Sequence, residues 1–152
     1  MLANHPTLRL AAPHEREALE ALQWRASLNN PGDRDALLAN PDAVAVPADQ
    51  IARNQVVVAE IGGAIVGFAA VLPRSDGQAE LDALFVDPAI WKSGIGRALV
   101  EECAKMARSQ GSAFLHVIGN PHAEGFYTNC GFERAGTTGT RFGEGLLMRK
   151  AL

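Results

Sequence analysis

Two glycines, Gly94 and Gly96, mark the point where a strand-like run passes into a long helical run. The strand-like run is Leu81 to Val86, and the helical run continues to Ser109. A glycine turn at such a junction lets backbone N–H groups converge, and the positive end of the helix dipole adds to their attraction for an anion. The junction therefore predicts a phosphate site on an α/β framework, or otherwise an ordinary glycine turn before a helix.

The spacing around these glycines excludes the two commoner nucleotide-binding loops. A dinucleotide fingerprint places a third glycine three residues after Gly96, where this chain has Leu99. A Walker-type loop has Lys-Ser or Lys-Thr after its last glycine, whereas Lys92-Ser93 precedes both glycines here. A phosphate-bearing ligand at this junction would therefore be bound neither by a dinucleotide fingerprint nor by a Walker-type loop.

The composition is that of a chain that can bury a core. Its 152 residues are 47% hydrophobic and 20% charged, which suits one globular domain over 1–152. The net charge of -3 gives no electrostatic reason to expect a nucleic-acid partner. No apolar run approaches membrane-spanning length, so we expect no membrane association and a cytoplasmic location. Cys103 and Cys130 fit no metal or disulfide framework, so we expect no metal.

Strand and helix signals alternate along the chain. We expect a helix that opens at Pro13 and ends at the Asn30-Pro31-Gly32 turn, and a tight hairpin at Gly62-Gly63. In the long helix, Glu101 and Lys105 have the spacing of an i,i+4 ion pair. The other expected helices are 33–39, 49–54, 95–109 and 120–129, with 42–48 left unassigned. The expected strands are 7–11, 56–60, 64–71, 80–86, 114–118, 132–135 and 146–151.

Two blocks of sequence resemble a known family. Val86-Asp87-Pro88 followed by Gly94-Ile95-Gly96-Arg97-Ala98-Leu99 resembles the acetyl-CoA-binding motif of the GNAT superfamily of N-acetyltransferases. A second block is similar to the family's penultimate strand, short helix and Gly-Phe turn: Leu115-x-Val117-x-x-Asn120-x-x-Ala123-x-x-Phe126-Tyr127-x-x-x-Gly131-Phe132. Leu8-Arg9-Leu10-Ala11 is also GNAT-like, and the resemblance covers most of the chain, least so over 12–54.

The resemblance implies an α/β (α+β) GNAT fold: a mixed, mostly antiparallel sheet with a central splay and helices on both faces. It implies transfer of the acetyl group of acetyl-CoA to a primary amine of a small molecule or a peptide, directly in a ternary complex and without a metal. The alternatives are a longer acyl donor and a non-catalytic CoA-binding sensor or interaction protein. The identity of the acceptor and the formation of a homodimer stay open.

The resemblance also implies which residues hold acetyl-CoA. The backbone of Leu84, Phe85 and Val86 binds the pantetheine arm, and a strand N–H near Val86 polarises the thioester carbonyl. Asn120 either contacts the pantetheine or caps the short helix. The pyrophosphate cradle comprises Lys92, Ser93, Gly94, Ile95, Gly96, Arg97 and Ala98. The charges of Lys92 and Arg97 either contact the phosphates or belong to solvated surface side chains.

The family motif usually has Gln or Arg three residues before the first glycine, where this chain has Trp91. A backbone cradle needs only N–H groups and space, so we expect the cradle to bind without that side chain. Trp91, Trp24 and the pair Arg141-Phe142 line either the acceptor pocket or a dimer contact, and the sequence does not decide between them.

Aminolysis of a thioester needs a base for the amine and a donor for the carbonyl oxygen. Glu80 is the candidate base, because Ala79-Glu80-Leu81 resembles the strand position where some GNAT members carry a catalytic glutamate. Asp82 lies two residues on, so strand alternation places both carboxylates on one face. Either carboxylate acts directly or through water, binds a cationic acceptor, or belongs to a solvated sheet face.

The leaving thiolate needs a proton, and Tyr127 is the candidate acid. It is the chain's only tyrosine and occupies the Phe-Tyr position of the family motif, where the phenol typically faces the coenzyme sulfur. A buried structural tyrosine is the alternative. His116 is a core residue or a proton carrier, and His122 is a residue of the cofactor site or of the surface. Cys130 has no identifiable His partner, so we expect no covalent intermediate on it.

Overall fold

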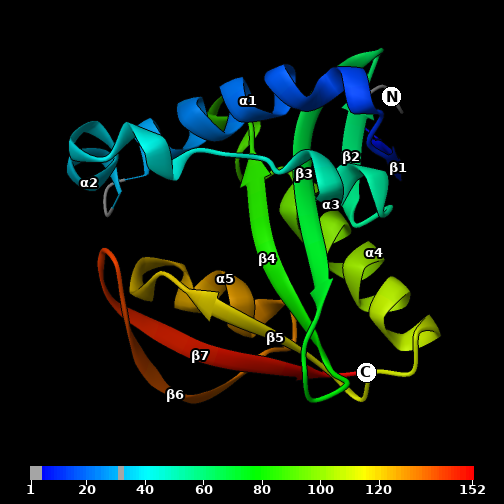
Figure 1. The fold of residues 1–152 in the computed structure, drawn as a ribbon, viewed down its shortest axis with the longest axis vertical. Helices are drawn as coiled ribbons and strands as arrows, with labels where there is room; N and C mark the ends of the chain where they lie inside the picture. The colour runs from blue at the N-terminus through cyan, green and yellow to red at the C-terminus, as the bar shows by residue number, and fades with distance from the viewer. Residues whose placement is uncertain (1–4, 31–32) are drawn as a thin grey trace.

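The computed structural model describes residues 5–30 and 33–152. These residues form a seven-stranded sheet in the order β1-β2-β3-β4-β5-β7-β6 (Figure 1). Among the described strands only β4 and β5 pair in parallel, and the other neighbours are antiparallel. The strands are β1 (Thr7–Leu10), β2 (Val56–Ile61), β3 (Ala64–Pro73), β4 (Ala79–Val86), β5 (Phe114–Gly119), β6 (Glu133–Thr140) and β7 (Gly143–Ala151).

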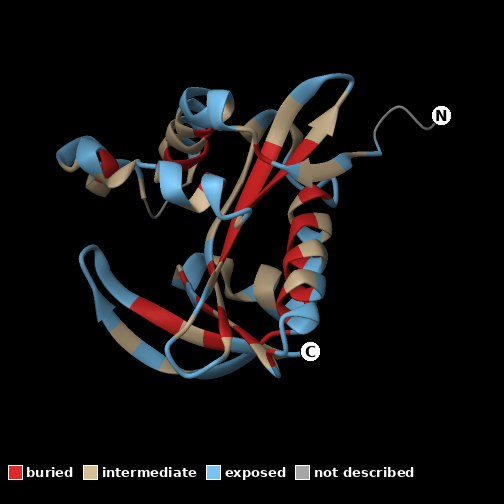
Figure 2. Ribbon diagram, turned by 45° about the vertical axis from the view of Figure 1, so that its right-hand side comes forward, coloured by how far each residue is buried: buried red, intermediate tan, exposed pale blue. Residues whose placement is uncertain are grey.

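Helices cover both faces of the sheet (Figures 1 and 2). They are α1 (Arg16–Asn29), α2 (Arg34–Ala39), α3 (Ala48–Ala52), α4 (Ile95–Ser109) and α5 (Glu124–Asn129). Short 3₁₀ turns precede or separate them at η1 (Pro13–Glu15), η2 (Pro41–Ala43), η3 (Pro88–Ile90) and η4 (Pro121–Ala123). No helix in the described part of the chain has the length and apolar character needed to cross a membrane.

The two-residue period of β3 divides the core between these faces. Phe68 and Ala70 pack in a cluster with Leu19 and Leu22 of α1. The alternate residues of β3 pack on the other face against an apolar stripe of α4, which is buried at every helical turn (Figure 2). The buried members of that stripe are Ile95, Leu99, Val100, Cys103, Ala104 and Ala107.

The sheet opens in its centre, between β4 and β5. The two strands pair only over Ala79–Leu81 and Leu115–Val117, although β4 continues to Val86 and β5 to Gly119. At the point where pairing stops, the register of β4 on β3 shifts, with Ala70 opposite Ala83 and Val71 opposite Leu81. Asp82 is therefore the extra residue of a β-bulge, which bends its strand and increases the local twist. Beyond this bulge β4 and β5 diverge, and the gap between them is the central splay of the sheet.

The mixed, mostly antiparallel sheet with a central splay and helices on both faces is confirmed. Two predictions of detail were wrong. The 120–129 segment is not one helix, because it divides into η4 and α5. Glu101 does not pair with Lys105: it pairs with Arg97 at 3.4 Å, and Lys105 approaches Glu102 at 3.9 Å.

The other differences lie at the ends of elements. The terminal hairpin is longer than expected, since β6 and β7 reach Thr140 and Gly143. The first helix follows a 3₁₀ turn at Pro13 and ends at Asn29, while residues 31–32 of the predicted turn lie outside the described residues. Within the unassigned segment 42–48, η2 ends at Ala43, an extended stretch follows, and α3 begins at Ala48.

Candidate active site

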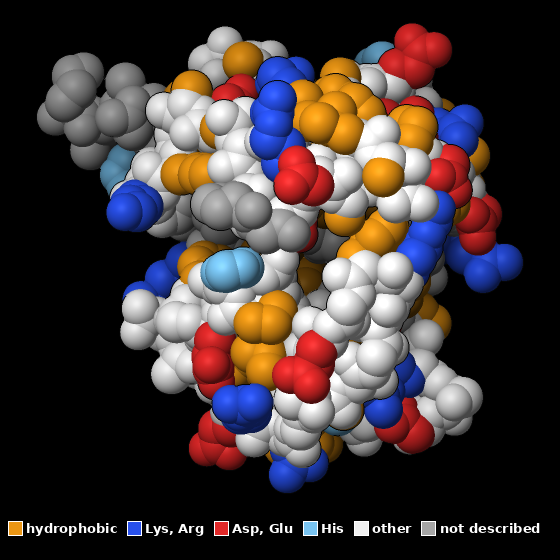
Figure 3. Space-filling view, turned by 90° about the vertical axis from the view of Figure 1, so that its left-hand side faces the viewer, with side chains coloured by type: hydrophobic (Ala, Val, Ile, Leu, Met, Phe, Trp, Pro, Cys, Tyr) orange, Lys and Arg blue, Asp and Glu red, His pale blue; other side chains and the backbone are white. Residues whose placement is uncertain are grey.

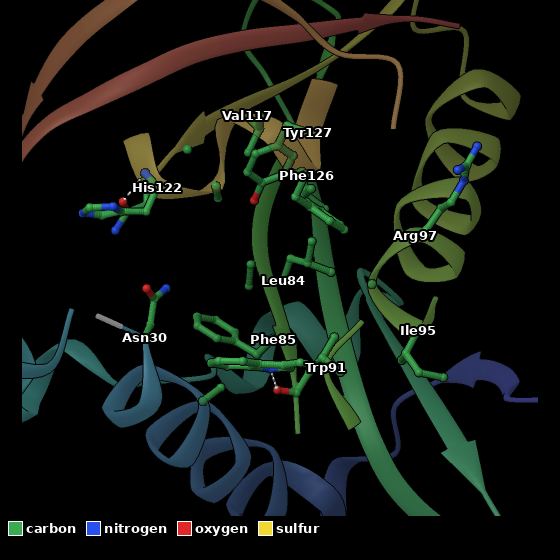
Figure 4. A pocket seen from close by; sticks show the side chains of 18 of the residues that line it. Asn30, Leu84, Phe85, Trp91, Ile95, Arg97, Val117, His122, Phe126 and Tyr127 are labelled. Carbon is green, nitrogen blue, oxygen red and sulfur yellow. Dashed lines mark hydrogen bonds between the residues drawn. The ribbon is translucent and has the colours of Figure 1, made fainter. Parts of the chain in front are cut away.

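A cavity of about 740 Å³ occupies the splay. Its walls are the separated ends of β4 and β5, the N-terminus of α4, the C-terminal end of α1 and the η4–α5 segment. Figure 3 shows the hollowed face between the helical layer above and the strands below, and Figure 4 shows the lining side chains. Asn30 of the α1 end and His122 of η4 face each other across the opening (Figure 4).

The backbone of β4 presents hydrogen-bonding groups to this cavity. Asp87 donates its N–H to the Val66 carbonyl at 2.8 Å, so the backbone of Asp87 faces β3. Because successive residues of a strand direct their backbone groups to opposite edges, the N–H and C=O groups of Leu84 and Val86 point away from β3. Both residues line the cavity. This edge can pair with an extended ligand as another strand would.

The turn into α4 forms an anion cradle. Gly94 has a φ of 88° and caps the helix without a side-chain hydrogen bond. The first helical bond runs from Ala98 N to Gly94 O at 3.0 Å, so the N–H groups of Ile95, Gly96 and Arg97 precede any helical acceptor. These groups, together with the helix dipole, attract a phosphate.

Gly96 also lets this turn fit closely against the neighbouring helix. A Cβ at Gly96 would lie 3.1 Å from Cζ of Phe126 in α5, which is closer than ordinary van der Waals contact. The missing side chain therefore brings the cradle and α5 together on one side of the cavity. The backbone groups of the cradle and the exposed cations Lys92 and Arg97 suit a pyrophosphate, and the β4 edge suits a pantetheine arm.

Most of the residues predicted to hold the cofactor line this one cavity, but two do not. Ser93 and Ala98 lie outside the lining. The Ser93 hydroxyl instead donates to the Ile90 carbonyl at 2.5 Å and closes the turn after η3. The predicted residues that do line the cavity are Leu84, Phe85, Val86, Lys92, Gly94, Ile95, Gly96, Arg97, Asn120 and Tyr127.

Tyr127 enters the cavity from α5. Its ring packs edge-on against Phe126 and Phe132, with centroids 5.2 and 5.4 Å away, and lies flat against Gly119 of β5. A Cβ at Gly119 would come within 3.0 Å of the tyrosine ring, so only glycine allows this position. Burial, with a smaller contribution from Cys130, raises the pKa of Tyr127 to about 12. The phenol is therefore protonated at neutral pH and can donate a proton or a hydrogen bond.

The two candidate carboxylates occupy different places. Asp82 is exposed and lines the cavity, whereas Glu80 is half-buried and lies outside the lining, opposite His116 in the paired part of β4 and β5. The bulge at Asp82 interrupts the strict alternation between them. Desolvation, and then the charge of Asp82, raise the pKa of Glu80 above its ordinary value. The two groups therefore interact electrostatically, although only Asp82 reaches the cavity.

The polar residues at the end of β5 have structural partners. Asn120 accepts a hydrogen bond from the His122 N–H at 2.9 Å, which caps η4, and donates to Asp33 at 2.8 Å. The second bond joins the η4 segment to the start of α2, across 87 positions of sequence. His122 lines the cavity, whereas His116 does not, and burial lowers the pKa of His116. Capping, one of the two alternatives for Asn120, is thus observed.

Trp91 has a contact that the sequence did not reveal. Its indole N–H donates to the Val86 carbonyl at 2.7 Å, and its ring lies on the cavity wall beside Phe85 (Figure 4). The indole thus takes up the last cavity-facing carbonyl of β4. The departure from the motif was visible in the sequence, but the partner of the side chain depends on how the loop folds back on the strand.

Lys92 adopts the left-handed conformation, with a φ of 66°. That conformation costs a non-glycine residue about 1 kcal/mol, so Lys92→Gly is expected to raise the free energy of unfolding by about 0.5 kcal/mol after the added chain entropy of glycine. Lys92→Val is expected to lower it by about 1 kcal/mol, because a β-branched side chain fits this region worst. Urea denaturation measures both variants, and a valine variant as stable as the glycine variant would contradict the assigned backbone.

Comparisons with known proteins identify the family and the fold. The model of the acetyltransferase (GNAT) family matches residues 16–132. Ribosomal-protein-alanine N-acetyltransferase from Brucella melitensis is 27% identical, with a TM-score of 0.73 and coverage of 96% of this chain and 99% of that one. A comparison with curated protein sequences found no significant match.

Two other similar structures contain the coenzyme. PaiA N-acetyltransferase from Thermoplasma acidophilum, in complex with coenzyme A, is 18% identical, with a TM-score of 0.75 and coverage of 97% of this chain and 99% of that one. YncA from Salmonella typhimurium, with acetyl-CoA, is 22% identical, with a TM-score of 0.71 and coverage of 98% and 95%. Because the family match spans most of the chain and the fold agrees, this protein belongs to the GNAT family of acetyltransferases.

Proposed function

We propose that this protein transfers the acetyl group of acetyl-CoA to a primary amine by direct attack within a ternary complex. One observation carries the proposal: a single cavity is lined by the α4 cradle, the β4 edge, the phenol of Tyr127 and the carboxylate of Asp82. When bound, acetyl-CoA supplies an activated acyl thioester. The residues of the chain supply binding, a hydrogen-bond donor for the carbonyl oxygen, and proton transfer.

The β4 edge orients the ligand and stabilises charge on its carbonyl oxygen. The Val86 N–H points to the cavity from a strand that β3 holds rigidly, so the donor needs little reorganisation as negative charge develops. Trp91 donates to the Val86 carbonyl on the same strand edge and fixes the direction of that carbonyl. The cradle at the start of α4 anchors the far end of the ligand, which sets the register of its reacting end on β4.

Tyr127 delivers a proton to the leaving sulfur. Its high pKa keeps the phenol protonated throughout the neutral range, and its packing against Gly119 aims the ring at the cavity from the β5 side. Cys130 lies next to Tyr127 but has a raised pKa, because burial disfavours its thiolate. A thiol held neutral is a weak nucleophile, which favours direct transfer over an acetylated cysteine.

The two carboxylates divide the work on the amine. Asp82 lines the cavity and binds the incoming ammonium group. Glu80 has a pKa raised by desolvation and by the charge of Asp82, which makes it a better base than an ordinary glutamate. Because it lies outside the lining, it takes the proton through an ordered water. His116, in register with Glu80 on β5, has a lowered pKa and is neutral at physiological pH.

Free thiol release tests the proposal. Purified protein is mixed with acetyl-CoA and a panel of small amines and short peptides, and mass spectrometry of the products follows each positive reaction. We expect amine-dependent thiol release with one acetyl group added to the amine. Clear CoA binding by calorimetry, without release for any amine, would instead support a sensor, and release that is faster with longer acyl thioesters would support another acyl donor.

Replacing Trp91 by Phe keeps a ring on the cavity wall but removes the indole donor. We expect the KM for acetyl-CoA to rise about 5-fold, which corresponds to one hydrogen bond worth about 1 kcal/mol. Trp91→Gln is the matched control, since its amide can donate to Val86 and is the residue usual in the motif, and it is expected to restore most of the loss. An unchanged KM in the Phe variant would show that the contact with Val86 does not hold the site in shape.

A further inference from the structure

A second cavity, of about 180 Å³, adjoins the cofactor cavity on the α1 side of the sheet. The two cavities share three lining residues, Asp82, Ala83 and Phe85, all on β4 at or just beyond the bulge. Asp82, which carries a carboxylate, therefore lies at their junction. A molecule in the second cavity would meet Asp82 at the boundary with the cavity that takes the thioester.

The lining of the second cavity is neutral apart from this carboxylate. Gln23 of α1 and Gln50 of α3 contribute half-buried side-chain amides. In the described part of the chain, neither of these amides has a hydrogen-bond partner within the protein. No Lys, Arg or His is among the described residues that line this space. The remaining lining residues are alanines, valines and phenylalanines, and among them Ala45 is exposed at the rim.

We propose that this second cavity binds the acceptor, and that the acceptor is a compact primary amine with a neutral hydrogen-bonding group at its other end. The inference rests on the proposed function and adds the substrate class. Asp82 pairs with the ammonium group at the junction, and the amides of Gln23 and Gln50 each offer both a donor and an acceptor to the far end.

Size and charge define what the cavity rejects. A space of about 180 Å³ equals about six water volumes, so the part of the acceptor beyond its amine has about six non-hydrogen atoms. A carboxylate or phosphate would be desolvated there without a cation to pair with, and beside the negative charge of Asp82. Amino acids with free carboxylates and phosphorylated amines are therefore poor acceptors.

Two sources supply this chemistry: a free small amine, and the first residue of a peptide, whose α-amino group is followed by a neutral amide. Three amines of equal length test whether the cavity rejects a negatively charged far end: 3-aminopropanamide, β-alanine and butylamine. We expect kcat/KM for 3-aminopropanamide to exceed that for β-alanine by at least about 10-fold, with butylamine between them. A peptide that begins with Gly-Ala forms the second arm, and its kcat/KM relative to 3-aminopropanamide identifies the source.

Two variants place the effect in the second cavity. Gln50→Leu keeps a similar volume but removes the amide. It is expected to raise the KM for 3-aminopropanamide about 10-fold without raising the KM for butylamine, whose far end makes no hydrogen bond, or for acetyl-CoA, which binds elsewhere. Ala45→Arg introduces a cation at the exposed rim and is expected to raise kcat/KM for β-alanine at least about 10-fold. A variant that fails to fold would lose activity with every amine. Gln50→Leu is instead expected to weaken the reaction of one amine, and Ala45→Arg to strengthen the reaction of another, so the two results together report recognition.

Failure of this inference is distinct from failure of the proposed function. Acetylation that favours bulky or anionic amines, with selectivity unchanged by Gln50→Leu and Ala45→Arg, would overturn the acceptor site and leave amine acetylation standing. If no amine is acetylated, calorimetry of 3-aminopropanamide and β-alanine with the CoA complex still decides. Binding of the amide alone, lost in Gln50→Leu, would support the site, and equal binding of both or of neither would overturn it.

Discussion

Tyr127→Phe is expected to lower kcat for acetyl transfer by about 10- to 1000-fold, because the leaving sulfur loses its proton donor, while the Kd for CoA stays within about twofold. The substitution removes one oxygen and leaves the ring packing on Gly119, Phe126 and Phe132 in place. Because the pKa of Tyr127 is about 12, the wild-type phenol stays protonated across the neutral range. The loss is therefore expected to be nearly constant from about one pH unit below neutrality to about two units above it, a range that lies wholly below this pKa.

Cys130→Ala provides the matched control for this result. Cys130 is buried beside Tyr127 and takes no part in the proposed chemistry. The kcat of the Cys130→Ala variant is therefore expected to remain within about twofold of wild type. Calorimetry with CoA and urea denaturation establish that both variants are folded and bind. Unchanged turnover in Tyr127→Phe would remove the tyrosine from the mechanism, and loss of turnover in Cys130→Ala would point to an acetylated cysteine.

Glu80→Gln is expected to lower kcat/KM by about 100-fold at neutral pH and to flatten the part of the pH profile that rises with pH. Desolvation and the nearby charge of Asp82 raise the pKa of Glu80, so its base form disappears as pH falls through a value above 4.5. The wild-type rate is therefore expected to fall on the acidic side, and this fall is expected to vanish in the Gln variant. Initial rates at saturating acetyl-CoA across the pH range measure the effect.

Asp82→Asn is expected to give a different signature. It raises the KM for the acceptor about 10-fold, since it removes the charge that holds the ammonium group. It keeps the acidic limb but moves it to lower pH, because one of the two causes that raise the pKa of Glu80 is gone. If Asp82→Asn flattens the limb and Glu80→Gln does not, then Asp82 is the base and the assignment of the two carboxylates is reversed.

The elements that the sequence predicted well carry local signals. The helix at 95–109 is marked in the sequence by apolar residues with a period of 3.6 between two glycines, and these residues form its buried face. The hairpin at Gly62-Gly63 appears as two apolar runs around a two-residue turn. In both cases the residues that fix the element are close together in the chain.

The features that were missed depend on contacts between distant residues. The bulge at Asp82 arises from how β4 pairs with β3, and nothing in the Glu80–Val86 run marks an extra residue. Strand β6 is an exposed edge rich in threonine and glycine, so it lacks the apolar alternation that would extend its prediction to Thr140. Trp91 was noted as a departure, but its bond to Val86 is visible only once the loop is folded.

The candidate site also combines features that local sequence predicts with features that depend on contacts between distant residues. The motif predicted the cradle and the β4 edge, since glycines and strand backbone are fixed by sequence position. The second cavity combines Gln23, Gln50 and Asp82 from two helices and a strand. No spacing rule connects these three residues, because their separation in the chain is set by the helices and loops between them. The acceptor class therefore became accessible only from the packing of α1 and α3 on the sheet.

A single-turnover experiment with acetyl-labelled acetyl-CoA tests the central claim most directly. Enzyme in excess over labelled ligand is mixed with the preferred amine and quenched at successive times, and the label is followed in protein, amine and water. We predict that label passes to the amine with one thiol released per acetyl group and none attached to the protein at any time. Label on the protein before the amine, or bound coenzyme with no label in any amine, would contradict direct acetylation in this cavity.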